Sequence, residues 1–290
     1  MDRAIRLEFT MIRQPLRSTF RSLAAAVACL SLGACASSNG LQSAATNPQQ
    51  AADQFTQVAD SALQKGDLAL AARFYAQAHA ADPARLGPLV SLGAVFAQMG
   101  DAQNAAKAYQ EALGLAANDP TLYHNYGLAL LRLGRPELAA VQFKQEIAIR
   151  PDAKAYSALG VALDMQGSYA AAQDAYRSAL AMAPADKTIL SNYGLSLALA
   201  GQYSAAIDTL RPIVADPTAT PTQRQNFALI LGLAGHMDEA AAIGRLDLDQ
   251  ASVERNLAYY QQLRQGNDHG AIVAALMPRG GQSIDVQPGQ

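Results

Sequence analysis

Apolar residues recur along this chain at helical spacing, in segments that come in pairs. Tyr123, Tyr126 and Leu130 lie three and four residues apart in one segment, and Phe143 lies in the next. Such spacing predicts amphipathic helices that each bury one face. A glycine marks the break within each pair, at intervals of 34, 34, 33, 34 and 34 residues, and an alanine follows each glycine after five residues: Gly66, Gly100, Gly134, Gly167, Gly201 and Gly235. This period predicts stacked repeats of one helix pair each.

The third unit carries the pattern most completely. It reads Tyr123-x2-Tyr126-Gly127-x2-Leu130, then Ala139-x3-Phe143, then Pro151. This pattern resembles the tetratricopeptide repeat, in which about 34 residues form two antiparallel helices. The resemblance implies an all-α fold, a right-handed tetratricopeptide-repeat superhelix of about six helix pairs with a C-terminal capping helix.

Glycines and prolines refine this picture. Gly127, Gly160 and Gly194 lie inside predicted first helices, where we expect them to let two helix backbones approach closely. Proline cannot continue a helix, so Pro151 and Pro184 are expected to end second helices.

Two residues depart from the repeat pattern near its end. Pro212 is expected to end the second helix of the fifth repeat early. Gly244 stands where earlier copies have Tyr or Phe, so the second helix of the sixth repeat is expected to pack weakly. A segment with apolar residues at Val253, Tyr260 and Leu263 then predicts a capping helix, followed by a short helix near residues 271–276.

The first residues predict export. Five arginines precede an apolar run over residues 23–34, which is typical of a secretory signal and is too short to span a bilayer. Leu32-Gly33-Ala34-Cys35 resembles a bacterial lipoprotein box, and this resemblance implies a covalent lipid on the thiol of Cys35; an ordinary signal peptide with a stray cysteine is the alternative. By the sorting pattern of enterobacterial lipoproteins, which this box resembles, Ala36 implies the outer membrane, with the protein lipid-anchored on the periplasmic face. Translation can start at Met1 or Met11.

The predicted organisation follows from these features. It comprises a lipoprotein signal peptide (1–34), a flexible lipid-to-fold linker (35–51), a repeat array (52–250), a capping helix (251–266), and a short helix with a disordered tail (267–290).

Charge and motifs exclude several classes of function. The chain holds 22 basic and 24 acidic residues, and removal of the leader leaves 17 basic and 22 acidic residues. No basic cluster is present, so nucleic acid is not an expected partner. The four histidines lie in no His-Glu-x-x-His motif, and the chain has no Gly-x-Ser-x-Gly motif or phosphate-binding loop. We therefore expect no catalytic residue, no metal and no cofactor other than the lipid.

The expected functional surface is the concave face that first helices form in such arrays. The inward positions of repeats three to six are mostly apolar, and the predicted partner groove comprises His124, Leu128, Leu131, Arg132, Val161, Asp164, Met165, Leu195, Leu199, Leu229 and Leu233. Such a groove suits an apolar or amphipathic segment of another protein, held as a helix or a strand. The alternatives are that these leucines pack helix on helix, and that His124 is an ordinary solvated histidine.

Three segments resemble the TadD family, outer-membrane lipoproteins of the tight-adherence (Tad, or Flp) pilus. They are LALAARFY at 68–75, TQRQNFALILGLAG at 222–235 and RNLAYY at 255–260. The resemblance implies a pilotin-like assembly factor that helps a secretin subunit reach or assemble in the outer membrane. A type IV pilus pilotin and a lipoprotein adaptor for peptidoglycan enzymes are the alternatives.

Overall fold

The structure, a computed structural model, describes residues 47–266 and 268–277. The predictions for the signal peptide, Cys35, residues 36–46 of the linker and the tail beyond Met277 lie outside the described residues. The described residues form helices and no strand, which confirms the all-α prediction. The helices are α1 (Pro48–Gln64), α2 (Leu68–Ala81), α3 (Leu86–Gln98), α4 (Ala102–Leu115), α5 (Pro120–Arg132), α6 (Pro136–Ile149), α7 (Ala153–Met165), α8 (Tyr169–Met182), α9 (Lys187–Leu199), α10 (Tyr203–Val214), α11 (Pro221–Ala234), α12 (Met237–Gly244), α13 (Gln250–Gly266) and α14 (His269–Leu276).

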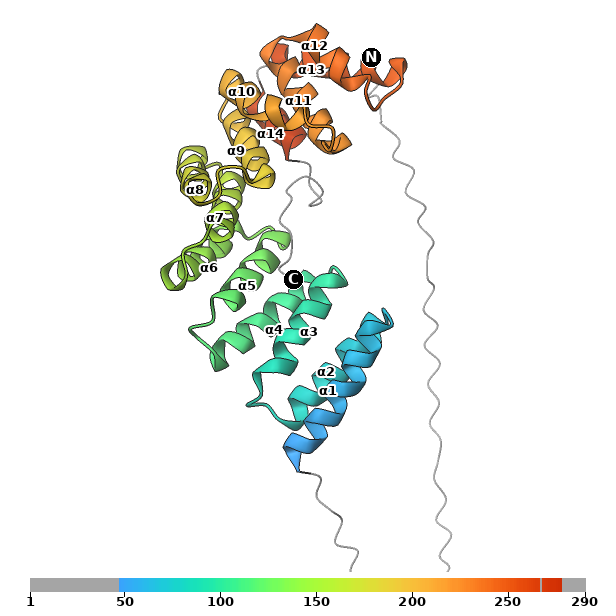
Figure 1. The fold of residues 1–290 in the computed structure, drawn as a ribbon, viewed down its shortest axis with the longest axis vertical. Helices are drawn as coiled ribbons and strands as arrows, with labels where there is room; N and C mark the ends of the chain where they lie inside the picture. The colour runs from blue at the N-terminus through green and yellow to red at the C-terminus, as the bar shows by residue number, and fades with distance from the viewer. Residues whose placement is uncertain (1–46, 267, 278–290) are drawn as a thin grey trace, which may run out of the picture. The chain divides into compact units, whose positions relative to one another are not determined.

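The helices form consecutive pairs from α1 and α2 to α11 and α12. Within a pair the two helices pack together, and each second helix also packs against the first helix of the next pair. In Figure 1 the first helices α5 and α7 lie on one side of the stack, and the second helices α6 and α8 lie on the other. The apolar core is therefore built in successive layers between neighbouring pairs, as in solenoid proteins.

The periodic glycines form the turns between the helices of each pair. All six have a positive φ, from 67° at Gly134 to 93° at Gly235. A residue with a Cβ atom rarely adopts this left-handed conformation, whereas glycine does so without steric cost. The constant spacing of these glycines thus reflects the same turn in every pair.

The glycines inside the first helices have a different role from the one expected. A Cβ atom on Gly127 would lie 2.5 Å from Cε1 of Phe143, and one on Gly160 would lie 2.7 Å from Cε1 of Tyr176. The close contact is therefore between a glycine of the first helix and an aromatic ring of the second. The glycine thus makes room for a side chain of the second helix, and at Gly194 that side chain is Leu210.

Two predicted boundaries also need correction. The linker was expected to extend to Ala51, but α1 begins at Pro48, because the Asn47 side chain accepts a hydrogen bond from the Gln49 N–H and caps the helix. Helix α10 continues past Pro212 to Val214. Pro212 is exposed, whereas Ile213 and Val214 are buried, and their burial holds the last turn in place.

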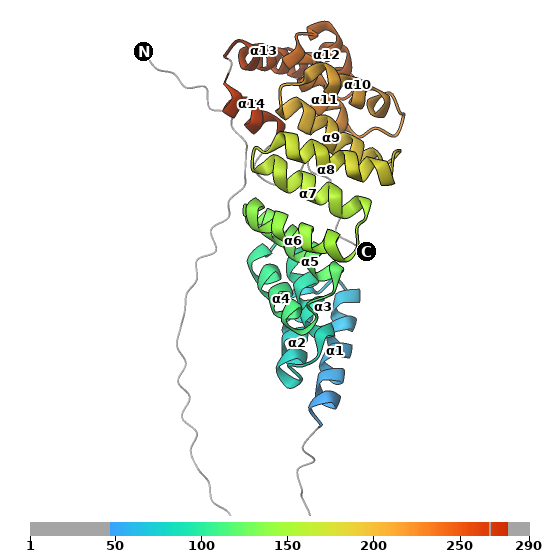
Figure 2. The ribbon, with the colours of Figure 1, turned by 90° about the vertical axis from the view of Figure 1, so that its left-hand side faces the viewer.

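The chain after α11 departs from the regular stacking. Helix α12 has eight residues, whereas α10 has 12 and α8 has 14. Helix α13 packs on both α11 and α12, and a Cβ atom on Gly232 of α11 would lie 2.5 Å from the Tyr260 ring. Helix α14 packs on α9, and both views show it beside that helix (Figures 1 and 2). No helix in the described part of the chain is both long and apolar enough to cross a membrane.

Candidate functional site

The first helices of repeats three to five present a strip of partly exposed apolar side chains. Leu128 and Leu131 come from α5, Met165 from α7 and Leu195 from α9. Each of these side chains packs partly against a core cluster and keeps some of its surface in solvent. Leu128 and Leu195 directly follow equivalent glycines, so they occupy the same position in repeats three and five. We call these four residues the apolar strip.

Arg132 lies beside the apolar strip and is exposed. Its guanidinium Nη1 donates a hydrogen bond to the carbonyl oxygen of Ala97, at 2.9 Å. Ala97 belongs to α3, so Arg132 ties the first helix of repeat three to that of repeat two. This predicted groove residue therefore contributes to the stacking of the repeats.

Four other predicted groove residues are buried. The exposed fractions of their side chains leave no surface for a partner in this conformation: Val161 2%, Leu199 2%, Leu229 6% and Leu233 4%. For these four the prediction of an open groove is wrong. Val161 packs in the core with Tyr176 and Ile189, as the helix-on-helix alternative expected.

Leu199, Leu229 and Leu233 are buried for another reason. They share one apolar cluster with Tyr260 and Leu263 of α13 and with Ile272 and Leu276 of α14. The C-terminal helices therefore take part in covering the first-helix side of repeats five and six. The groove predicted there is filled by the chain itself.

The residue types at one position of the repeat support the conclusion that the C-terminal helices cover repeats five and six. Gln98, Arg132, Met165, Leu199 and Leu233 occupy the same position in repeats two to six. The first two are exposed, Met165 is partly exposed, and the two leucines are buried. The position thus changes from polar to leucine where the C-terminal helices pack.

His124 forms a buried pair with Glu146. Its Nδ1 lies 2.9 Å from Oε2 of Glu146, its ring packs against Phe143, and its Nε2 has no hydrogen-bond partner among the described residues. Both side chains are almost fully buried, so neither the partner contact nor the solvated histidine expected from the sequence is correct. The sequence contains a signal for this pair, because Glu146 replaces the buried alanines Ala112 and Ala179 of neighbouring repeats.

Asp164 is also buried, and it links repeats four and five. The Tyr176 hydroxyl donates to Oδ2 at 3.0 Å, and the Ser196 hydroxyl donates to Oδ1 at 2.7 Å. Burial raises the pKa of the Asp164 carboxyl to about 7, while the two hydrogen bonds act in the opposite direction. The expectation that Asp164 faces a partner is therefore wrong, since its carboxyl is enclosed between α7, α8 and α9.

Comparison with known proteins identifies the repeat. Residues 90–156, 125–187 and 157–220 each match the tetratricopeptide repeat family. The protein contains tetratricopeptide repeats. No curated protein matches the chain in sequence.

Solved structures share this tetratricopeptide fold. PilF of Pseudomonas aeruginosa aligns with a TM-score of 0.57 and 19% identity, over 73% of this chain and 99% of that one. MamA of Desulfovibrio magneticus RS-1 aligns with a TM-score of 0.53 and 22% identity, over 56% and 92%. A chain of the Cut9–Hcn1 hetero-tetramer aligns with a TM-score of 0.55 and 20% identity, over 72% and 42%. At these identities the likeness concerns the fold alone.

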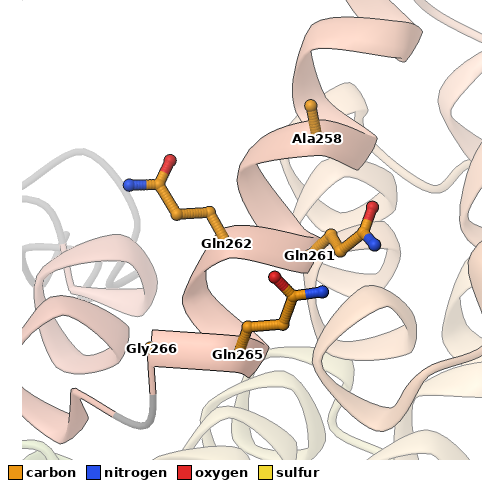
Figure 3. Close-up of a pocket in the computed structure, with 5 residues that line it drawn as sticks. All are labelled: Ala258, Gln261, Gln262, Gln265 and Gly266. Atoms are coloured by element: carbon orange, nitrogen blue, oxygen red, sulfur yellow. The ribbon is translucent and has the colours of Figure 1, made fainter.

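The described part of the tetratricopeptide array offers little that suits chemistry. No group of three or more His, Cys, Asp or Glu residues there could hold a metal ion. Figure 3 shows an open pocket on one helix, α13, with glutamine side chains that spread away from the helix: it is lined by Ala258, Gln261, Gln262, Gln265 and Gly266. None of these residues is a nucleophile or a charged group. Tetratricopeptide arrays mediate protein–protein interaction, and the apolar strip is a surface that suits this role.

Proposed function

We propose that this protein is a non-catalytic, lipid-anchored scaffold on the periplasmic face of the outer membrane. In this proposal it acts as a pilotin-like assembly factor for the secretin of a Tad/Flp pilus. The observation that carries the proposal is the apolar strip, because partly exposed leucines on the first helices of a tetratricopeptide array can bind an apolar segment of another protein.

The chemistry of the strip defines the partner segment. Its four members are aliphatic or thioether side chains, which bind by burial of apolar surface and contain no group that clamps a carboxylate. Arg132, a cation beside the strip, already donates to the Ala97 carbonyl. An apolar or amphipathic segment therefore fits better than a charged chain terminus.

The membrane part of the proposal rests on Cys35, which lies outside the described residues. Several acyl chains on one residue hold a protein firmly on a bilayer. We expect Cys35→Ser to move the protein from the membrane fraction to the soluble fraction while its helix content stays unchanged. Retention of Cys35→Ser in the membrane fraction would refute lipid anchoring.

The partner is tested by a crosslinked pull-down from envelope membranes. Wild type is compared with Leu128→Asp, which places a charge in the strip, and with Val141→Asp as the matched control. Val141 is 51% exposed on the second helix α6, away from the strip. We expect the secretin subunit to be captured by wild type and by Val141→Asp, and to be lost with Leu128→Asp, with equal helix content in all three.

The same experiment separates the rival functions. The likeness in fold to PilF keeps a type IV pilus pilotin as the second candidate, and capture of a type IV pilus secretin would favour it. Capture of peptidoglycan enzymes in place of a secretin would refute both pilotin readings. Equal capture by Leu128→Asp and Val141→Asp would refute the strip as the binding surface.

A further inference from the structure

Helix α14 occupies the first-helix side of repeat five in the way a partner helix would. It packs on α9, beside which it lies in both views of the molecule (Figures 1 and 2). Ile272 and Leu276, four residues apart, point into the array and are buried, whereas Ala274 is exposed. The amphipathic face of α14 thus fills an apolar surface with two aliphatic anchors one turn apart.

The surface under α14 is continuous with the apolar strip. Leu195 of the strip packs against the cluster that contains Ile272 and Leu276. Leu199 in the same cluster occupies the position that is polar and exposed as Gln98 in repeat two. Removal of α14 would extend the strip from α5 and α7 across α9.

The attachment of α14 is mainly apolar, because Ile272 and Leu276 are buried and Ala271, Val273, Ala275 and Met277 pack against the same cluster. The helix has eight residues, and a helix this short does not persist alone in water. Asp268 caps it by accepting the Ala271 N–H, and its polar contact with the array is between the His269 Nε2 and the hydroxyl of partly exposed Tyr169, at 3.4 Å. Helix α13 is longer, with 17 residues, and packs on both α11 and α12, where Tyr260 sits directly against the Gly232 backbone.

We propose that α14 is an internal, displaceable occupant of the partner-binding surface. An apolar helix of the partner, with two aliphatic side chains four residues apart and small residues beside them, takes the place of α14 on α9. This inference deepens the proposed function and rests on it for the identity of the partner. The binding-competent form is then the one with α14 released, so the closed form lowers the apparent affinity for the partner.

The test uses the full chain and a fluorescent peptide with the sequence of residues 268–277. Peptide affinity is measured for the wild type, for Ile272→Asp combined with Leu276→Asp, and for Ala274→Asp as the matched control on the exposed face. We expect the double variant to bind at least about tenfold more tightly than the wild type, and Ala274→Asp to match the wild type. A control peptide with alanine in place of both anchors should bind none of them.

A milder variant guards against damage to the fold. Asp268→Ala removes the cap of α14 and keeps the buried anchors Ile272 and Leu276, so it should raise peptide affinity by about fivefold. Equal affinity of the wild type, the double variant and Asp268→Ala would overturn the proposal. A large fall in the thermal midpoint of Asp268→Ala would also overturn it, since α14 would then be a structural part of the array.

Failure of this inference is distinguishable from failure of the proposed function. If release of α14 leaves the peptide affinity unchanged but the secretin is captured through Leu128, the proposed function stands and the displaceable helix is refuted. If the peptide binds the opened variants but no secretin is captured, the displaceable helix stands and the proposed partner is refuted.

Discussion

The buried carboxyl of Asp164 should make the free energy of unfolding depend on pH, and Asp164→Asn should remove this contribution. The carboxyl accepts hydrogen bonds from Tyr176 and Ser196 and is enclosed between three helices. Asp164→Asn keeps the shape of the side chain and cannot ionise. Because one hydroxyl can turn to accept from the amide N–H while the other still donates to the amide oxygen, the variant resembles the protonated aspartate.

The magnitude follows from the two pKa values of this carboxyl. It is about 3.9 in an unfolded chain and about 7 in the folded protein, where burial raises it. The folded chain therefore binds more protons than the unfolded chain between these values, and its stability falls as the pH rises through this interval. Each pH unit corresponds to about 1.4 kcal/mol, so the contribution present below about pH 4 falls by about 4 kcal/mol once the pH exceeds 7.

Urea unfolding monitored by circular dichroism measures this effect. The quantity of interest is the difference in free energy of unfolding between Asp164→Asn and the wild type, because all other titrating groups cancel in it. We expect this difference to grow in favour of the variant as the pH rises from about 4 to about 7. Asp174→Asn is the surface control, since Asp174 is exposed in the same repeat.

A difference between Asp164→Asn and the wild type that stays constant over this pH range would refute the reasoning. It would mean that the carboxyl titrates alike in the folded and unfolded chains. A difference that grows toward low pH would have the wrong sign, and it would show that the two hydrogen bonds outweigh burial.

Two further predictions concern the packing of the repeats. Gly160→Ala should lower the free energy of unfolding by about 1–3 kcal/mol, because its Cβ would overlap the Tyr176 ring. Gly114→Ala is the control at an open helical position, and it should leave the free energy of unfolding unchanged or raise it by up to about 1 kcal/mol. Equal effects of the two substitutions in thermal melts would contradict the ring contact. Glu146→Ala should cost about 1–3 kcal/mol by leaving buried His124 without its partner. Combination with His124→Val should recover most of that loss, since repeat two has Val90 and Ala112 at these positions; no recovery would show that the cost arises elsewhere.

Local structure could be predicted from the sequence because it depends on residues that recur. The turn glycines, the prolines after α6 and α8, and the small residues of the second helices specify each pair independently of its neighbours. The same reasoning placed the later helices near Val253 and Ala271, where α13 and α14 lie. The sequence does not predict the start of α1, because the capping residue Asn47 lies within a polar segment that is typical of a linker.

The candidate site was predicted less well, because helical spacing does not specify how a helix is rotated in the stack. Leu128 and Leu195 remain partly exposed, while Val161, at the same position in repeat four, is buried. A residue at a nominally inward position can thus lie in the core, as Val161 does with Tyr176 and Ile189. The position of α14 depends on contacts across 70 residues or more of chain, such as that between Tyr169 and His269, and no local pattern contains this information.

Residues that differ from the repeat pattern indicate contacts that the pattern itself does not predict, because such residues pair with one another in the fold. Glu146 occupies a position that is alanine in other repeats, and it pairs with His124, which occupies the position of a valine in repeat two. Ser196 stands where Ala129 and Ala162 are buried, and it donates to Asp164, another exception, in the preceding repeat. A polar group enters such a core without large cost only when a second change supplies its hydrogen-bond partner. By the same logic the leucines that replace polar residues in repeats five and six require a cover, and in this protein α13 and α14 provide it.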